Sequence, residues 1–184
     1  MRSKIRTMIK TRKTAIKETI RREGGLVDHP NDPGGITKFG ISLRYLKSEG
    51  DLGDFDRDGD IDADDVRGMT EDQAVEIYEQ IWDEGRYDEL PPEIAGKVFD
   101  LEVNTGRGRA VKILQQACRA SGPKITVDGI LGPVTRHVAS SIPPDELLAA
   151  IRVEAASFYR RLVAARPSLE VFLKGWLRRA YDEV

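Results

Sequence analysis

Apolar residues recur at spacings of three and four along most of this sequence, and this period constrains the fold more than any other feature. The period is that of an amphipathic helix, so little of the chain is left for strands. The main interruption, residues 23–40, is too rich in glycine and proline to continue a helix and is typical of a loop or short hairpin. We therefore expect a mainly α, two-lobed helical fold with at most a small β-hairpin.

Capping residues divide the helical pattern into separate segments. Ser42 is a suitable N-cap, and Thr70 with Gln73 forms a capping-box pattern. The core should include aromatic residues at helical spacing, namely Phe158, Tyr159, Phe172 and Trp176. The expected helices cover residues 1–22, 41–50, 70–82, 93–104, 109–120, 133–140, 145–165 and 168–181.

Composition bounds the class of protein. A length of 184 residues suits one domain or two small lobes, and the 40% of hydrophobic residues can supply a core although 33% are charged. The single cysteine, Cys118, excludes an internal disulfide, and with two histidines a Cys/His zinc site is not expected. No apolar run is long enough for a membrane-spanning helix.

The net charge of −2 is the sum of regions with opposite signs. Residues 1–22 hold nine basic residues and one acid, 51–65 hold eight Asp and one Arg, and 152–179 hold seven basic residues and two Glu. The basic helix 1–22 is either a solvated face on a helix packed through its isoleucines or a surface attracted to an anionic partner. Nucleic acid is not expected as that partner, because no aromatic residues are interleaved with the basic ones.

The most informative segment covers residues 23–41. Glu23 ends the first expected helix, where the negative end of the helix dipole favours the neutral form of a carboxyl group, as a general acid requires. Asp32 follows in the same glycine-rich segment. Inverting cleavage of a glycosidic bond needs such a pair, an acid for the leaving oxygen and a carboxylate about 6.5–9.5 Å away that directs a water. The pair alone is weak evidence, since both residues also suit a helix end and a turn.

The wider string Glu-Gly-Gly…Asp-Pro-Gly-Gly-x-Thr-x-x-Gly-Ile resembles glycoside hydrolase family 108, the N-acetylmuramidases of phages and bacteria. Its Glu–Asp–Thr pattern is similar to the triad of phage-type lysozymes. The resemblance implies a lysozyme-like fold with Glu23 as general acid, Asp32 as the residue that positions or deprotonates a water, and Thr37 as a residue that holds this water. Asp28 is a competing second carboxylate, and a mechanism that needs Glu23 alone is also open.

The resemblance continues through the second half of the chain. Residues 99–106, 114–116 and 127–135 are similar to the peptidoglycan-binding region usually attached to this family. They imply substrate-binding roles for Asn104, Gly106 and Asp128. We therefore expect a muramidase catalytic region over 1–90 and a helical peptidoglycan-binding region over 91–184, packed as one lysozyme-like unit.

Residues 54–65 follow the spacing of EF-hand and dockerin-like calcium loops. Gly59 allows the sharp turn at the sixth position, and Asp62 fits the ninth. A solvated acidic loop is the alternative, but carboxylates this close repel one another without a cation. We expect a structural Ca²⁺ and no cofactor for the chemistry. The expected ligands are Asp54, Asp56, Asp58, Asp60 through its backbone carbonyl, and Asp65.

The resemblance thus predicts an endolysin-type lysozyme that hydrolyses the β-1,4 bond between N-acetylmuramic acid and N-acetylglucosamine in bacterial peptidoglycan and lyses the cell. Two alternatives are a non-catalytic, calcium-stabilised wall-binding module and a lytic transglycosylase. The N-terminus lacks the apolar core of a signal peptide, so we expect the protein in the host cytoplasm before its release to the periplasm and cell wall. We expect peptidoglycan as partner, contact of residues 1–22 with the anionic envelope, and a monomer.

Overall fold

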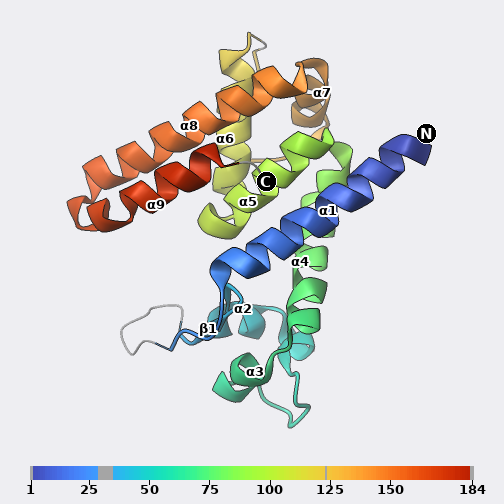
Figure 1. The fold of residues 1–184 in the computed structure, drawn as a ribbon, viewed down its shortest axis with the longest axis vertical. Coiled ribbons are helices and arrows are strands. Elements are labelled where there is room, and N and C mark those ends of the chain that lie inside the picture. The colour runs from blue at the N-terminus through green and yellow to red at the C-terminus, as the bar shows by residue number, and fades with distance from the viewer. Residues whose placement is uncertain (1, 29–34, 123, 183–184) are drawn as a thin grey trace. The chain divides into compact units, whose positions relative to one another are not determined.

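The computed structural model describes residues 2–28, 35–122 and 124–182. Within these ranges the chain forms nine α-helices and one small antiparallel sheet (Figure 1), which confirms the predicted mainly α class with one hairpin. None of the described helices is long and apolar enough to cross a membrane. The elements in order are α1 (Arg2–Glu23), β1 (Thr37–Lys38), β2 (Ile41–Ser42), α2 (Leu43–Ser48), α3 (Ala63–Gly68), α4 (Glu71–Gly85), α5 (Pro92–Thr105), α6 (Arg107–Ala120), α7 (Pro133–Ser141), α8 (Pro144–Ala165) and α9 (Glu170–Tyr181).

Contacts between residues divide the chain into two compact units. The hairpin unit is Ile16–Ile81 and contains the sheet, α2 and α3. The helical unit is Met1–Ala15 with Trp82–Val184 and contains α5 to α9. The helices α1 and α4 contribute residues to both units.

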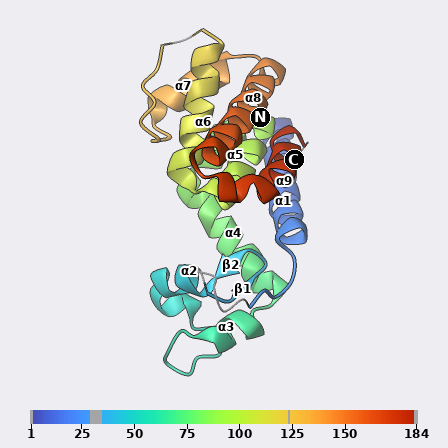
Figure 2. The same cartoon turned by 90° about the vertical axis from the view of Figure 1, so that its left-hand side faces the viewer.

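The core of the helical unit lies around α5, which packs against α6 and α8 (Figure 2). Residues 94–101 are all buried, so this helix is covered on every side. Trp82 lies with its ring centroid 5.1 Å from that of Phe99 and 5.5 Å from that of Tyr87, and the three rings anchor α5 to the end of α4. The continuous run of buried residues in α5 therefore forms the centre of this core.

Buried charged residues fasten the C-terminal end of α9 to α5. Lys97 Nζ donates hydrogen bonds to the carbonyl oxygens of Arg179 at 2.6 Å and Asp182 at 3.2 Å. The carboxylate of Asp100 accepts a hydrogen bond from Arg179 Nε at 3.0 Å. Because the last carbonyls of a helix have no partner within it, the buried ammonium group satisfies the end of α9.

In the hairpin unit, α1 ends where Gly24 takes φ +72° and its N–H donates to the carbonyl of Ile20 at 3.1 Å. The chain returns as β1, which pairs with β2 in the antiparallel register Thr37↔Ser42. Val27 forms a bridge to Thr37 from the other side. Thr37 therefore lies between two extended segments.

Capping side chains begin the helices of the hairpin unit. Ser42 Oγ accepts a backbone N–H of α2 at 3.2 Å, and Thr70 Oγ1 accepts the N–H of Gln73 at 3.2 Å, as predicted. A capping box of Asp62 and Asp65 begins α3. Sequence periodicity did not predict α3, because its six residues are too few for a helical period to show.

Candidate active site

Glu23 is the last residue of α1, and its half-buried side chain lies against the turn of the hairpin. A Cβ atom at Gly40 would lie 2.7 Å from Glu23 Cγ and 2.7 Å from Tyr78 Oη. Gly40 also has φ +80°, so both space and backbone conformation require glycine here. The predicted general acid, the hairpin turn and a tyrosine hydroxyl therefore meet around one point.

Tyr78 holds the hairpin turn in place. This buried residue of α4 donates a hydrogen bond from Oη to the carbonyl of Phe39 at 2.7 Å. The N–H of Phe39 donates to the carbonyl of Gly24 at 3.1 Å, so the turn is also bonded to the chain directly after Glu23. The sequence placed Tyr78 on the apolar face of its helix, and no motif indicated its contact with the hairpin.

Thr37 lies in β1 with its backbone fully engaged. Its N–H and C=O exchange hydrogen bonds of 2.8 Å with Val27, and Oγ1 donates to the carbonyl of Gly35 at 3.2 Å. A hydroxyl that donates once still has lone pairs that can accept from a water. Glu23 and Thr37 thus belong to one hairpin unit, whereas Asp32, the predicted second carboxylate, lies outside the described residues.

Asp28, the competing carboxylate, is held by α3. Its Oδ2 lies 3.2 Å from an Arg67 guanidinium nitrogen, and Arg67 also binds Asp64 at 2.7 Å. The carbonyl of Arg67 accepts a hydrogen bond from Lys38 Nζ at 2.6 Å. The helix that follows the acidic loop is therefore bonded to β1 and to the segment before it.

The acidic loop before α3 brings three predicted calcium ligands together. One carboxylate oxygen from each of Asp54, Asp56 and Asp58 lies within 4.8 Å of the other two. The N–H of Gly59 donates to Asp54 Oδ2 at 3.1 Å, and Gly59 has φ +100° at the predicted turn. The loop therefore has the bend that its glycine predicted, and it brings the three carboxylates close together.

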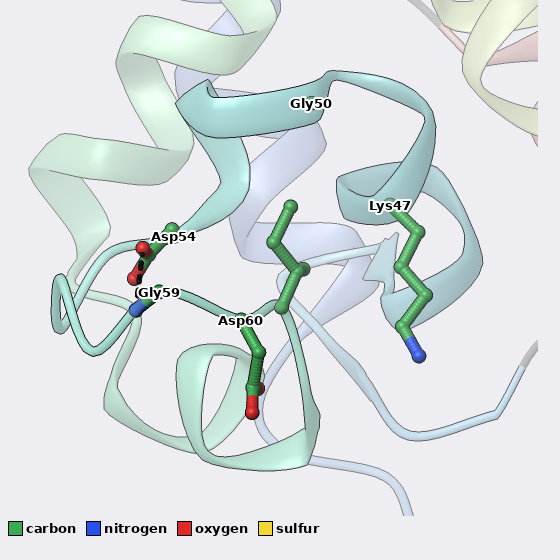
Figure 3. A pocket seen from close by; sticks show the side chains of 6 residues that line it. Lys47, Gly50, Asp54, Gly59 and Asp60 are labelled. Atoms are coloured by element: carbon green, nitrogen blue, oxygen red, sulfur yellow. Dashed lines mark hydrogen bonds between the residues drawn. The ribbon is translucent and has the colours of Figure 1, made fainter.

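Asp60 lies beside this cluster and lines a pocket of about 310 Å³. Figure 3 shows Lys47 of α2 on one side of the pocket and Asp54, Gly59 and Asp60 of the loop on the other. The nearby carboxylate of Asp58 is the main cause of the raised pKa of Asp60. For Asp56, loss of hydration raises the pKa first, and neighbouring carboxylates raise it further. Repulsion from neighbouring carboxylates thus contributes to both raised pKa values, and it is the largest cause only for Asp60.

Asp65 closes the same loop from α3. It is buried, and its two oxygens accept backbone hydrogen bonds from Phe55 at 2.7 Å and Asp62 at 2.8 Å. Asp54 Oδ1 is also buried, and among the described residues it accepts no hydrogen bond. The loop thus satisfies the carboxylate of Asp65 and leaves an oxygen of Asp54 without a donor.

The predicted substrate-binding residues all lie in the helical unit. Asn104 Oδ1 accepts a hydrogen bond from Tyr159 Oη at 3.0 Å. Gly106, at φ +80°, separates α5 from α6. Asp128 lies in the loop before α7, where a Cβ atom on its neighbour Gly129 would lie 2.8 Å from the carbonyl of Gly108. This loop therefore approaches the start of α6, close in sequence to Gly106.

A buried glutamine organises that loop. Gln115 Nε2 donates to Asp128 Oδ1 at 2.7 Å and to Thr135 Oγ1 at 3.1 Å, while Oε1 accepts the N–H of Gly129 at 2.9 Å. The hydrogen bond from Gln115, followed by that from the N–H of Ile130, lowers the pKa of Asp128. The sequence did not indicate this role for Gln115, because a glutamine on a helix is usually exposed.

Comparison with known proteins defines the class to which this fold and site belong. Residues 16–106 match the family described as glycosyl hydrolase 108, and residues 109–181 match the family described as a predicted peptidoglycan domain. The chain therefore combines a glycosyl hydrolase 108 domain with a peptidoglycan-binding domain, which confirms the resemblance found in the sequence.

A solved structure supports the same conclusion. The structure of Brucella abortus SagA is similar with a TM-score of 0.74 and 26% sequence identity, over 92% of this chain and 89% of that chain. A search of curated proteins found no match. The protein is thus a glycoside hydrolase of family 108 type with a domain for binding peptidoglycan.

Proposed function

We propose that the protein is an N-acetylmuramidase that hydrolyses the β-1,4 bond between N-acetylmuramic acid and N-acetylglucosamine in bacterial peptidoglycan. The observation that carries the proposal is the place of Glu23, at the end of α1 against the hairpin turn and inside the glycosyl hydrolase 108 match. A carboxyl group at this position can act as a general acid, which donates its proton to the leaving glycosidic oxygen.

In the proposed reaction, Glu23 gives its proton to the glycosidic oxygen as the bond to C1 of N-acetylmuramic acid breaks. A water attacks C1 from the opposite face and loses a proton to the second carboxylate, which we assign to Asp32. Thr37 Oγ1 accepts a hydrogen bond from this water, since its own proton is directed to Gly35. Asp28 is the alternative base, and its ion pair with Arg67 would have to open before it could act.

The first experiment compares wild type with Glu23→Gln on purified sacculi. Wild type should release reducing ends, and Glu23→Gln should be at least about 100-fold slower with an unchanged melting temperature. Mass spectrometry separates the alternatives, because a lytic transglycosylase leaves anhydromuramyl ends and a wall-binding module releases no products. Full activity of Asp32→Asn would remove the two-carboxylate scheme and leave Glu23 as the single acid.

We also propose an endolysin role, in which the protein accumulates in the host cytoplasm before release to the periplasm and cell wall. The support is the pairing of a hydrolase domain and a peptidoglycan-binding domain in one chain. Cells that express the protein in the cytoplasm should lyse only after the inner membrane is permeabilised, and cells with Glu23→Gln should not lyse. Contact of residues 1–22 with the anionic envelope and the monomeric state stay predictions.

We propose, finally, that the loop 54–65 binds a structural Ca²⁺. The support is the match to the calcium-loop spacing, the three carboxylate oxygens within 4.8 Å of one another, and the buried oxygen of Asp54 that accepts no hydrogen bond from the described residues. The backbone carbonyl of Asp60 completes the proposed set. Asp65, the fifth predicted ligand, already accepts the backbone N–H groups of Phe55 and Asp62. No chemical step depends on this ion.

A further inference from the structure

The distal half of the α8–α9 pair keeps an apolar face at the surface of the helical unit. The two helices pack side by side (Figure 1), and Ile151, Ala155 and Tyr159 of α8 are buried. From residue 160 to residue 179, however, no residue is buried. In this stretch Phe172 and Val171 are exposed, and the half-buried apolar residues are Leu162, Val163, Leu169, Leu173, Trp176 and Leu177.

Three aromatic rings run in a row from the buried part of this pair to its surface. Trp176 stacks on Tyr159 with centroids 5.4 Å apart and planes 23° apart, and Phe172 stacks on Trp176 at 5.6 Å and 28°. Tyr159 is buried, whereas Phe172 is 53% exposed. The prediction that these aromatic residues belong to the core is therefore correct for Tyr159 and wrong for Phe172.

The exposed end of this row is strongly cationic. Residues 160–179 carry one acid, Glu170, and an excess of basic residues, and the pairing of Arg179 with Asp100 leaves the others at the surface. An aromatic and cationic surface suits a partner that combines ring-shaped sugars with negative charge. The basic residues are Arg160, Arg161, Arg166, Lys174, Arg178 and Arg179.

We infer that the row formed by Phe172 and Trp176 is a docking surface for the glycan strands of peptidoglycan. The C–H face of an N-acetylated pyranose stacks on such rings, and the basic residues attract the carboxylates of the peptide stems. The row lies inside the 109–181 match to a peptidoglycan domain, which selects this occupant over a lipid surface or a second copy. The inference rests on the proposed function only in taking peptidoglycan as the ligand.

The test measures binding of the Glu23→Gln protein to purified sacculi by sedimentation, so that no substrate is consumed. Phe172→Ala should weaken binding about tenfold, as expected for the loss of a stacked ring worth about 1.4 kcal/mol. Phe172→Tyr should restore it. Val171→Ala is the matched control, because Val171 is 80% exposed and points about 100° away around the helix. It should bind within about twofold of the parent.

Other outcomes overturn the inference. Unchanged binding of Phe172→Ala, or equal losses in Phe172→Ala and Phe172→Tyr with lowered melting temperatures, would remove the docking surface. A wild-type dimer that dissociates in Phe172→Ala would assign the surface to a second copy instead. If Phe172→Ala abolished binding to anionic phospholipid vesicles and left binding to sacculi unchanged, the surface would belong to a lipid partner. If wild type binds through Phe172 but releases no reducing ends, the proposed hydrolysis fails and the docking surface stands.

Discussion

Two loops of this protein are each closed by one buried side chain from a neighbouring helix, but the chemistry of the two side chains differs. In the helical unit, the neutral amide of Gln115 both donates to Asp128 and accepts from Gly129. In the hairpin unit, the carboxylate of Asp65 can only accept, and it takes the N–H groups of Phe55 and Asp62. Both loops are therefore fixed, but only Gln115 supplies a donor.

This difference decides what happens to the other carboxylates of each loop. The amide donor of Gln115 lowers the pKa of Asp128, so this loop is complete with protein groups alone. In the acidic loop, the pKa values of Asp56 and Asp60 are raised, and the protein adds negative charge where a donor is needed. The raised pKa values support the proposed Ca²⁺ in the acidic loop, whereas protein donors already satisfy Asp128 in the other loop.

The largest effect expected from this comparison is that of Gln115→Leu. The substitution leaves the N–H of Gly129 without its acceptor and removes the amide donor from Asp128 and Thr135, so the free energy of unfolding should fall by about 3 kcal/mol. Urea denaturation should give the same loss in Ca²⁺ and in EGTA. Gln116→Leu, one residue further along α6, is the control and should lose much less. If the loss of unfolding free energy in Gln115→Leu differed between Ca²⁺ and EGTA, the proposed difference between the two loops would be wrong.

The next largest effect is that of Ca²⁺ on the wild type. Calcium at about 100 times its Kd should stabilise the folded protein by about 2.7 kcal/mol, and EGTA should reverse the gain. The double variant Asp56→Asn with Asp58→Asn keeps the oxygen that accepts the N–H of residue 58 and should lose the response. Asp128→Asn, in the other loop, should keep it. Equal responses of the two variants would contradict the calcium site.

The sequence predicted those parts of the molecule that depend on local patterns. Capping by Ser42 and Thr70 and the glycine turn at Gly59 follow from neighbours within a few residues, and the structure confirms them. The hairpin and the position of Glu23 at a helix end followed in the same way.

Contacts between distant residues could not be predicted. Tyr78 bonds to a carbonyl 39 residues away, and Gln115 to a loop 13 to 20 residues away, so neither leaves a local pattern. Phe172 has the spacing of a core residue, but no described element of its unit covers it, and its side chain is exposed. The missed residues are thus those whose role depends on tertiary neighbours.

Tyr78 extends the comparison to the hairpin, where a neutral donor on a helix again fixes a loop. Tyr78→Phe removes the hydrogen bond to Phe39 and should cost about 1 kcal/mol of stability. If this hydrogen bond also holds the hairpin in the position that the transition state requires, losing about 1 kcal/mol there should lower kcat on sacculi about fivefold and leave KM unchanged. Tyr181→Phe, at a side chain that is 50% exposed, is the control and should change neither. An unchanged kcat in Tyr78→Phe would confine the residue to a structural role.

The smallest expected effect is the pH dependence of the stabilisation by Ca²⁺. The aspartates of the two loops should change stability with pH in opposite directions. The pKa values of Asp56 and Asp60 are raised above the ordinary 3.8. In EGTA, their protonated forms therefore stabilise the folded protein in acid, and this contribution is lost as pH rises through the raised pKa values. Ca²⁺ needs the ionised carboxylate of Asp56 as a ligand, so the difference in melting temperature between Ca²⁺ and EGTA should be full at pH 7. It should shrink on acidification before an ordinary aspartate would protonate.

The effect of Asp128 on stability has the opposite pH dependence. Its pKa is lowered in the folded state, so its contribution to stability is present above the pKa of the unfolded chain and is lost as pH falls through the pKa of the folded protein. Asp128→Asn should therefore flatten the acid side of the stability curve in EGTA while the calcium difference keeps its pH dependence. Melting curves from pH 7 to below the ordinary aspartate value of 3.8 measure both quantities. A calcium difference that stayed constant over this range would show that the carboxylate of Asp56 does not bind the ion, because protonation of a ligating oxygen competes with Ca²⁺.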